Sequence, residues 1–290
     1  GKDSLAVFTD VVSPWNLTSR VFKQIFSLQS VGVKGDWSNY TLFPAVFKKA
    51  GYHVSFLSNQ FPYGISYTPD WTNNLSGGFF LNHPQLNKQM FDYRNTNIHE
   101  YDEELLNDYK NIGIKEKSQL IIFHLLGQHF QYSLRCKSNM KRFGTNDYPR
   151  TDLTKKEKQT IADYDNATLH NDYVLSKIIE LFKDKEAIVI YLSDHGEDCY
   201  GKDAQMAGRL TEAEQIDIKK YHEEFEIPFW IWCSTTYRRK HHKIFIETLQ
   251  ARNNKFMTDA LPHLLFYLAG IKTKDYKAER NLISPYFNNA

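Results

Sequence analysis

Ala187-Ile-Val-Ile-Tyr-Leu-Ser-Asp-His-Gly-Glu-Asp198 is the stretch that decides the fold. Its first six side chains have apolar bodies without alternation, a pattern typical of a strand buried on both faces of a parallel sheet. Asp194 and His195 follow that strand, at the end where open α/β sheets place their ligand sites. A zinc-like ion accepts both carboxylate and imidazole donors. The alternative is an ordinary strand-to-loop junction with solvated polar residues.

Length and composition favour one soluble α/β unit. At 290 residues, one large domain over 1–290 is favoured over two small ones. The hydrophobic fraction of 41% and the charged fraction of 24% are ordinary for a globular protein. The net charge of +2 gives no bulk electrostatic case for a nucleic-acid partner. Basic stretches at 135–137, 141–142 and 238–243 are interpreted as solvated faces, with an anionic membrane surface as the alternative for one of them.

The cysteines and the chain start carry further expectations. Cys136, Cys199 and Cys233 are far apart and form no CxxC pair, so no disulfide framework is indicated, and one disulfide between two of them stays open. No window of about 18 apolar residues predicts a membrane span, and no signal peptide is visible. Gly1-Lys-Asp-Ser4 stands directly before an apolar strand. We therefore expect an excised part of a longer protein.

Strands and helices alternate along the chain. Helix 42–50, ended by Gly51, and strand 52–57 form the αβ step of a doubly wound sheet. Residues 62–97 are aromatic and polar, and we expect loops and minor strands that cover the site. The alternation indicates the α/β class, and no composition shift marks a domain boundary. The other expected elements are strands at 5–8, 119–126, 187–192 and 227–233, helices at 18–28, 102–109, 155–182 and 256–270, and a polar helix or loop at 213–221.

Polar side chains follow three of the apolar strands. They are Ser58-Asn59-Gln60, Gly127-Gln128-His129 and Ser193-Asp194-His195. Carboxyl ends of parallel strands meet at one edge of a sheet, so we expect these groups to converge. A lone histidine at a strand end is usually structural, and the agreement of three strand ends is the stronger signal.

These motifs resemble a known family. Ser193-Asp-His-Gly-Glu197 resembles the metal motif of the alkaline phosphatase and sulfatase superfamily. Phe123-His-Leu-Leu-Gly-Gln-His129 is similar to the His-x-x-Gly-x-His segment of the lipid-linked phosphoethanolamine transferases, a membrane-anchored branch of it. The resemblance implies an α/β/α sandwich with a largely parallel central sheet. It extends to the helix around 164–175, to the Ile-Pro-Phe strand at 227–232, and to residues 8–19, which resemble the nucleophile loop.

Thr18 stands where this resemblance places the phosphorylated threonine. Its hydroxyl is expected at a helix N-terminus, where free N–H groups and the helix dipole favour a phosphate. The alternative is that Thr18 merely caps that helix. A free threonine hydroxyl is a poor nucleophile, and a bound metal ion is the natural means of ionising it. We therefore expect Thr18, Asp194 and His195 to bind the metal.

The resemblance also implies substrate-binding residues and cofactors. His129 and His222 are expected to bind the substrate phosphate or a second zinc ion, Asn59 to donate to a phosphate oxygen, and His124 to contribute to the same site. The cofactor is one or two Zn²⁺ ions, with Mn²⁺ as the alternative. The family takes a further acidic ligand from an upstream Gly-Glu-Ser/Thr segment, so weak zinc binding is expected of this chain. His241 and His242 are interpreted as exposed and His263 as a packed residue.

The activity implied by the resemblance is a two-step transfer. Thr18 takes phosphoethanolamine from phosphatidylethanolamine and passes it to lipid A or to the lipopolysaccharide core. This implies a monomer at the membrane surface, anchored in the inner membrane with its catalytic domain facing the periplasm. Ser13-Pro-Trp-Asn16 does not fit the Cys/Ser-x-Pro-x-Arg motif of sulfatases. The alternatives are a phosphoglycerol transferase, another hydrolase of the superfamily, and a non-catalytic relative that binds glycolipids.

Overall fold

The strand of the 187–198 motif lies in an antiparallel three-stranded sheet of the computed structural model, which describes residues 4–60, 84–113, 118–201, 206–209, 217 and 219–288. The strand is β6 (Ile188–Leu192), and the sheet has the order β1 (Leu5–Phe8), β9 (Phe229–Cys233), β6. The central strand β9 runs antiparallel to both neighbours, with Phe229 opposite Phe8 on one side and Leu192 on the other. The expectation of a buried strand in a parallel sheet is wrong for this segment. β6 is an edge strand that pairs antiparallel with β9, and each of its residues is only partly buried.

A second sheet is parallel throughout. It has the order β4 (Tyr93–Arg94), β3 (His53–Ser58), β5 (Gln119–His124). Small ladders join β2 (Val11–Val12) to β10 (Phe256–Met257) and β7 (Asp198–Cys199) to β8 (Ala207–Gly208). The carboxyl ends of β3 and β5 therefore lie side by side, as expected for parallel neighbours.

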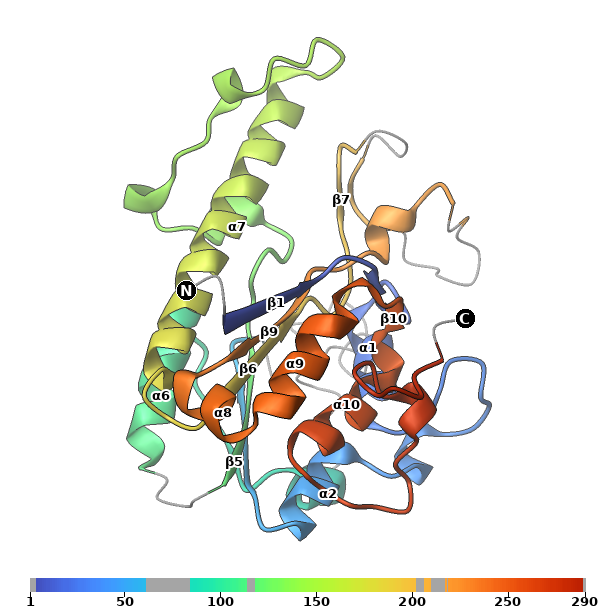
Figure 1. Cartoon of the computed structure of the whole chain (residues 1–290). Coiled ribbons are helices and arrows are strands. Elements are labelled where there is room, and N and C mark those ends of the chain that lie inside the picture. The colour runs from blue at the N-terminus through green and yellow to red at the C-terminus, as the bar shows by residue number, and fades with distance from the viewer. Residues whose placement is uncertain are drawn as a thin grey trace.

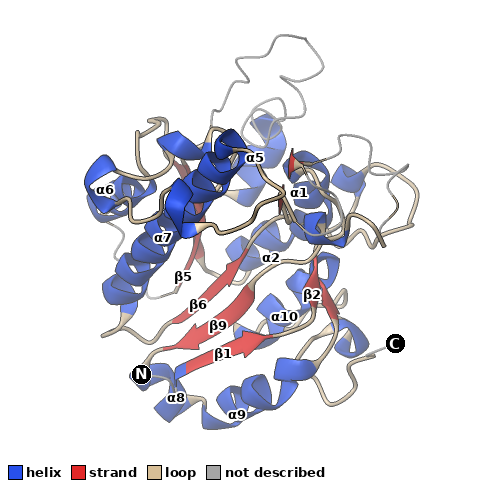
Figure 2. Ribbon diagram, turned by 90° about the horizontal axis from the view of Figure 1, so that it is seen from above, coloured by secondary structure: helices blue, strands red, loops and turns tan. Residues whose placement is uncertain are grey.

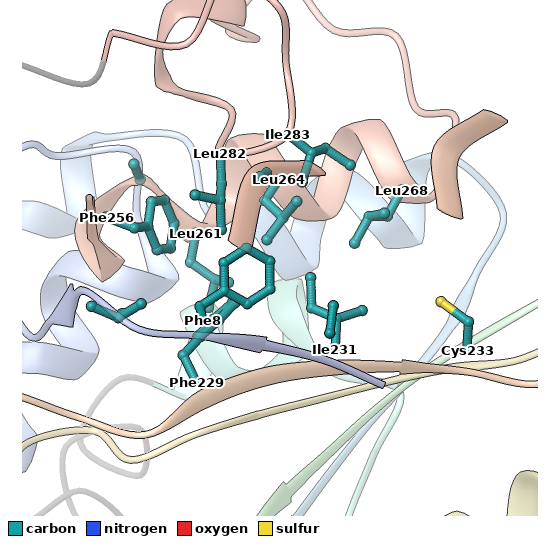
Figure 3. Packing of buried hydrophobic residues seen from close by; sticks show 14 of the residues in the cluster. Phe8, Phe229, Ile231, Cys233, Phe256, Leu261, Leu264, Leu268, Leu282 and Ile283 are labelled. Carbon is teal, nitrogen blue, oxygen red and sulfur yellow. The ribbon is translucent and has the colours of Figure 1, made fainter. Parts of the chain in front are cut away.

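Alternating residues of the strands face two helical layers. Phe229, Ile231 and Cys233 of β9 pack in one hydrophobic cluster, whereas Trp230 faces the other side. The first side is covered by α8 (Thr235–Lys240), α9 (His242–Gln250) and α10 (Leu261–Leu268), as Figure 3 shows for the aliphatic residues of α10 above Phe8 and Phe229. Figures 1 and 2 show α6 (Leu105–Ile112) and α7 (Lys155–Phe182) on the other side. The sandwich is therefore α/β/α, as predicted.

A third cluster surrounds the parallel sheet. It contains Val54 and Phe56 of β3 together with apolar residues of α1 (Thr18–Phe26), α2 (Phe43–Lys49) and α5 (Pro84–Met90). Phe266 of α10 belongs to this cluster, while its neighbour Leu264 belongs to the cluster on β9. Helix α10 therefore connects the packing of the two sheets.

Several elements differ from the sequence predictions at their ends. The helix expected over 256–270 is three elements: β10, a 3-10 turn Thr258–Ala260, and α10, because Phe256 donates its N–H to the Asp10 carbonyl and Pro262 lies in the first turn of α10. The helix at 18–28 ends at Phe26, and the one at 102–109 is a 3-10 turn, Asp102–Glu104, followed by α6. Most of the expected loops at 62–97 and most of the segment 213–221 lie outside the described residues.

The three cysteines are free thiols, so the disulfide that stayed open from the sequence is not formed. Cys136 and Cys233 are buried, and burial raises the pKa of both thiols. Among the helices in the described ranges, none combines the length and the hydropathy that crossing a bilayer requires.

Candidate active site

Thr18 is the first residue of α1, and its side chain does not cap the helix. The N-cap position belongs to Leu17, and no side chain caps this end. The Thr18 hydroxyl instead lies 3.2 Å from His195 Nε2. The capping interpretation of Thr18 is therefore wrong. Thr18 thus stands at a helix N-terminus, where backbone N–H groups and the helix dipole favour an anionic group.

The turn after β6 fixes the orientation of His195. Its Nδ1 lies 2.8 Å from the Gly196 carbonyl oxygen, so Nδ1 carries the hydrogen and Nε2 keeps its lone pair toward Thr18. Ser193 Oγ donates to the His195 carbonyl at 2.5 Å and closes the turn. Gly196 N–H donates to the Glu224 carbonyl at 2.9 Å, and a Cβ on Gly196 would lie 2.0 Å from the Glu223 carbonyl oxygen. Only glycine therefore allows this close approach.

Three donor atoms converge with a spacing that suits zinc. His195 Nε2 is 3.2 Å from Thr18 Oγ1 and 3.4 Å from Asp194 Oδ2. Ligands of a tetrahedral zinc ion lie about 3.3 Å apart when the zinc–ligand bonds are about 2.0–2.1 Å. Asp194 Oδ2 is buried and has no hydrogen-bond partner within the described part of the chain. Because a buried carboxylate oxygen needs a partner, this set fits a metal ion.

The charge state of Asp194 agrees with this fit. Burial alone would raise its pKa, but the neighbouring His195 and Thr18 side chains outweigh this effect and hold the pKa below the ordinary value. In the described ranges, no group of three or more His, Cys, Asp or Glu side chains is gathered for a metal. Thr18, Asp194 and His195 are therefore the candidate donor set.

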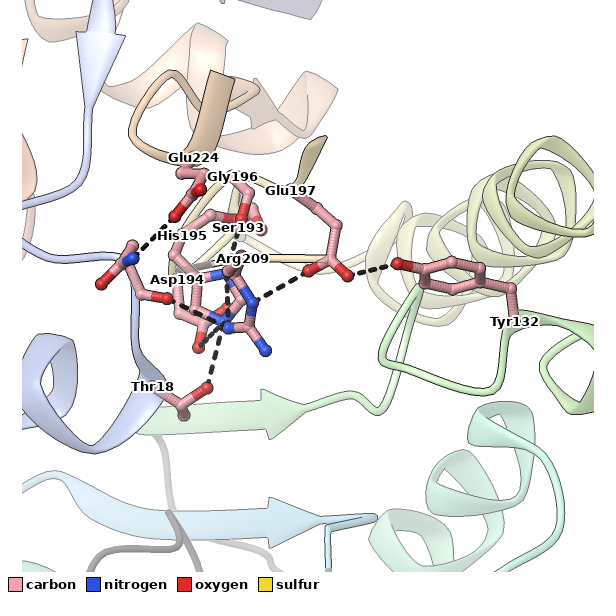
Figure 4. Close-up of polar contacts among 10 residues, drawn as sticks. Thr18, Tyr132, Ser193, Asp194, His195, Gly196, Glu197, Arg209 and Glu224 are labelled. Carbon is pink, nitrogen blue, oxygen red and sulfur yellow. Dashed lines mark hydrogen bonds and ion pairs between the residues drawn. The ribbon is translucent and has the colours of Figure 1, made fainter. Parts of the chain in front are cut away.

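Arg209, which the sequence did not single out, adds a positive charge to this site. Its Nη1 contacts His195 Nε2 and lies 3.1 Å from the Asn16 carbonyl oxygen, which accepts a hydrogen bond. Its Nε lies 3.0 Å from Glu197 Oε2, and Tyr132 donates its hydroxyl to Oε1 of the same carboxylate (Figure 4). Nε2 has a single lone pair, so a metal on His195 requires Nη1 to leave it. The ion pair with Glu197 can hold Arg209 beside the site both with and without a metal on His195.

His124, the last residue of β5, and His129, which follows that strand, both lie near this site. Burial, followed by the charges of Arg209 and Arg135, lowers the pKa of His129 to about 4. Burial also lowers the pKa of His124 to about 4, against an attraction to Asp194 that raises it. His124 Nδ1 lies 2.9 Å from Ser58 Oγ, and its buried Nε2 has no hydrogen-bond partner among the described residues. Both imidazoles are therefore neutral at pH 7.

Two other expected substrate residues have different surroundings. Asn59 is 1% exposed, donates from Nδ2 to Asp102 at 2.8 Å and accepts the His99 N–H at 2.7 Å. These contacts tie the end of β3 to the chain around 99–102, which gives Asn59 a structural role. His222 begins a 3-10 turn, and its side chain has no hydrogen bond or ion pair with any residue of the described ranges. The structure therefore brings Thr18, Asp194 and His195 together, with His129 and His124 close by, and gives neither Asn59 nor His222 a contact with them.

The loop before Thr18 is held by a buried acid that sequence reasoning missed. Glu224 is 0% exposed, and its Oε2 accepts a hydrogen bond of 2.7 Å from Asn16 Nδ2. Ser13 N–H donates to the Phe225 carbonyl at 2.8 Å, and Ile227 N–H donates to the Val11 carbonyl at 3.0 Å. An Asn–Glu pair 208 residues apart has no sequence signal, so only the fold could identify it.

Comparisons with known proteins agree with this geometry. A family model described as sulfatase matches residues 2–271. Phosphoethanolamine transferase EptC of Escherichia coli strain K12 is 27% identical over 290 residues, which cover 98% of this chain and 47% of that protein. Kdo(2)-lipid A phosphoethanolamine 7''-transferase of the same strain is 30% identical over 118 residues, 41% of this chain and 20% of that protein.

A solved structure is similar over the same length. The crystal structure of the C-terminal periplasmic domain of EcEptC from Escherichia coli, in complex with zinc, superposes with a TM-score of 0.81 at 26% identity. The superposition covers 98% of this chain and 77% of that one. The chain spans about half the length of the curated relative that it matches over most of its own length.

Proposed function

The chain belongs to the sulfatase family, and from this membership and the geometry at Thr18 we propose that it is the catalytic domain, over 1–290, of a phosphoethanolamine transferase. The observation that carries the proposal is the Thr18 hydroxyl, placed at the start of α1 within 3.2 Å of His195 Nε2. The similarity to EptC over 98% of the chain supports the group that is transferred.

The first step forms a phosphothreonine. Thr18 Oγ1 attacks the phosphorus of phosphatidylethanolamine, and the bond between phosphorus and the glycerol oxygen breaks. The hydroxyl proton of Thr18 is returned overall to that oxygen, so diacylglycerol leaves. In the second step an oxygen of the acceptor attacks the same phosphorus and the bond between phosphorus and Thr18 Oγ1 breaks. The proton of the acceptor hydroxyl is returned overall to Oγ1, so the Thr18 hydroxyl is restored. The acceptor that we propose is lipid A or the lipopolysaccharide core, supported by the name of the Kdo(2)-lipid A relative.

Each residue of the site has a role in this reaction. Asp194, His195 and Thr18 would hold Zn²⁺, which would lower the pKa of the Thr18 hydroxyl and neutralise negative charge on the phosphate. Arg209, fixed by Glu197, provides a positive charge beside the phosphoryl oxygens, where phosphoryl transfer needs it. His129 and His124, both neutral, can donate or accept hydrogen bonds at the phosphate without adding charge. The amides at the start of α1 bind the same group.

The location follows from the substrate. The phosphatidylethanolamine donor is a membrane lipid, so we propose that the domain works as a monomer at the periplasmic surface of the inner membrane. The similar EcEptC structure is described as a C-terminal periplasmic domain, which supports this location.

The experiment that tests the proposal is covalent labelling. The 290-residue chain is incubated with zinc and phosphatidylethanolamine in detergent micelles, digested, and examined by mass spectrometry. We expect the mass of phosphoethanolamine on the peptide that contains Thr18, together with released diacylglycerol. Labelling by phosphatidylglycerol instead would favour the phosphoglycerol transferase. Glycolipid binding without any labelling would favour the non-catalytic relative.

A further inference from the structure

Exposed apolar side chains follow His129 closely in the sequence. Phe130, Leu134 and Phe143 have exposed fractions of 63%, 57% and 40%. They are three of the nine most exposed large apolar side chains in the part of the chain that the structure describes. Together with the exposed Lys141 and Arg142 we call them the 130–143 patch.

The patch stands on a fixed support. Tyr132, between Phe130 and Leu134, is 6% exposed, packs edge-on against Tyr164 of α7 at 5.1 Å and donates its hydroxyl to Glu197. Asn166 of α7 accepts the N–H groups of Arg142 and Phe143 at 2.7 and 3.0 Å and donates to the Phe143 carbonyl at 2.9 Å. The apolar side chains are therefore held outward by an anchored segment.

The same segment concentrates positive charge. From Gln128 to Asn146 the sequence has four cations, Arg135, Lys137, Lys141 and Arg142, and no carboxylate. The whole chain has 36 cations and 34 anions, so the remainder has 32 cations and 34 anions and a net charge of −2. Lys137 is paired with Glu103, whereas Lys141 and Arg142 are exposed. The patch therefore combines apolar tips with a local excess of positive charge.

We propose that the 130–143 patch binds the surface of an anionic phospholipid bilayer. Phe130 and Leu134 enter the headgroup region, and Lys141 and Arg142 face lipid phosphates, as in other peripheral membrane surfaces. The occupant is a bilayer because it offers an apolar layer beneath a negative one, which complements this arrangement. The inference rests on the proposed function in one respect, because a lipid donor must reach Thr18. Contacts from Tyr132 to Glu197, from Glu197 to Arg209 and from Arg209 to His195 connect the patch to the site.

Vesicle co-sedimentation tests the proposal. The 290-residue chain is mixed with vesicles of phosphatidylethanolamine and phosphatidylglycerol, and separately with zwitterionic vesicles, at low and at physiological salt. We expect binding to the anionic vesicles that weakens with salt. The double variant Phe130→Ser, Leu134→Ser and the double variant Lys141→Gln, Arg142→Gln are each expected to bind about tenfold more weakly. Tyr286→Ser is the control, because Tyr286 is 76% exposed outside the patch, and its binding should equal the wild type.

Two results would overturn the inference: no binding of the wild type, or equal binding by patch variants whose thermal melting shows that they are folded. Labelling of Thr18, measured alongside vesicle binding, distinguishes failure of the membrane-binding proposal from failure of the proposed transfer reaction. Patch variants should label Thr18 normally from lipid dispersed in detergent and poorly from lipid in vesicles. Vesicle binding without labelling of Thr18 in any form of the protein would reject phosphoethanolamine transfer and leave the patch in place.

Discussion

Thr18 and His195 are 177 residues apart in the sequence, and Thr18 Oγ1 lies 3.2 Å from His195 Nε2. One residue begins a helix and the other follows an edge strand of the antiparallel sheet. Because Nδ1 of the same ring is engaged by the Gly196 carbonyl, the hydroxyl meets the nitrogen that keeps a lone pair. The proposed nucleophile therefore contacts a proposed metal ligand directly.

The hydroxyl of Thr18 should be essential for transfer and dispensable for folding. Thr18→Val is expected to abolish labelling and transfer, with a change in unfolding free energy below about 1 kcal/mol, because no capping bond is lost. Thr18→Ser keeps a hydroxyl and should retain part of the activity. Transfer assays and thermal melting on the same samples measure both effects. A folded valine variant that still transfers would contradict the threonine mechanism.

Zinc should bind through Asp194. The wild-type chain is expected to melt at a higher temperature with zinc, and a chelator should reverse the effect. Asp194→Asn should weaken zinc binding at least tenfold in titration calorimetry, since the amide is a poorer ligand. Asp152→Asn is the matched control, because Asp152 is exposed and paired only with Arg150. Equal zinc affinity in the two variants would remove Asp194 from the metal site.

His129 and His222 should respond differently to substitution. His129→Ala is expected to lower turnover at least tenfold, since the loss of a charge-stabilising contact in a transition state costs about 2–4 kcal/mol. His222→Ala should leave turnover near the wild-type value, because its side chain contacts none of the site residues that the structure describes. Steady-state kinetics on both folded variants make the comparison. Full activity of His129→Ala would give this residue a structural role.

Gly196 should be irreplaceable for stability. In Gly196→Ala the new Cβ would lie 2.0 Å from the Glu223 carbonyl oxygen, and backbone must move to admit it. We expect a loss of about 3 kcal/mol in denaturant unfolding. Gly144→Ala is the control, because its Cβ would meet nothing within 4 Å and its φ is −139°. Similar stability of the two variants would show that the turn after β6 relaxes easily.

His263 should make the protein less stable in acid. Burial, then the charges of Arg280 and Lys277, lowers its pKa from 6.5 to about 4. Below pH 6.5 the unfolded chain binds a proton that the folded chain refuses, so the unfolding free energy falls as the pH drops from about 6.5 to about 4. The contribution is at most about 3.5 kcal/mol, at about 1.4 kcal/mol per pH unit.

The pH dependence of unfolding isolates this residue. His263→Gln should flatten the fall in unfolding free energy between pH 6.5 and 4, measured by denaturant titration at each pH. His242→Gln, at an exposed position, should leave the fall unchanged. An unchanged slope in His263→Gln would show that the folded protein accepts the proton at this position.

Local sequence patterns predicted most helices and strands, whereas pairing between distant segments decided strand direction and the short strand β10. Helix α7 begins and ends where the sequence indicated, because Thr154 and Glu157 form a capping box at its start and the helical pattern continues to Phe182. The antiparallel direction of β9 could not be read from the sequence, because a buried apolar run looks the same in either direction. The prediction of one helix over 256–270 was wrong because β10 forms by pairing with β2, which is distant in the sequence.

The candidate site likewise contains residues that the sequence predicted and residues that only the fold revealed. Asp194 and His195 were predicted from their place after a strand, and Thr18 from a resemblance. Arg209 and Glu224 lie in a polar stretch without periodicity, so their contacts with His195 and Asn16 depend on the fold alone. Asn59 has the right position at a strand end, but Asp102 and His99 occupy its amide.

The chain from Glu224 to Ile227 serves as a common template for two distant loops. It accepts the Gly196 N–H and the Asn16 amide at Glu224, accepts the Ser13 N–H at Phe225, and donates to Val11 from Ile227. The segment 224–227 therefore fixes the spacing between the loop before Thr18 and the turn that contains His195. Changes in the surrounding surface loops can therefore leave the spacing between Thr18 and His195 unaltered.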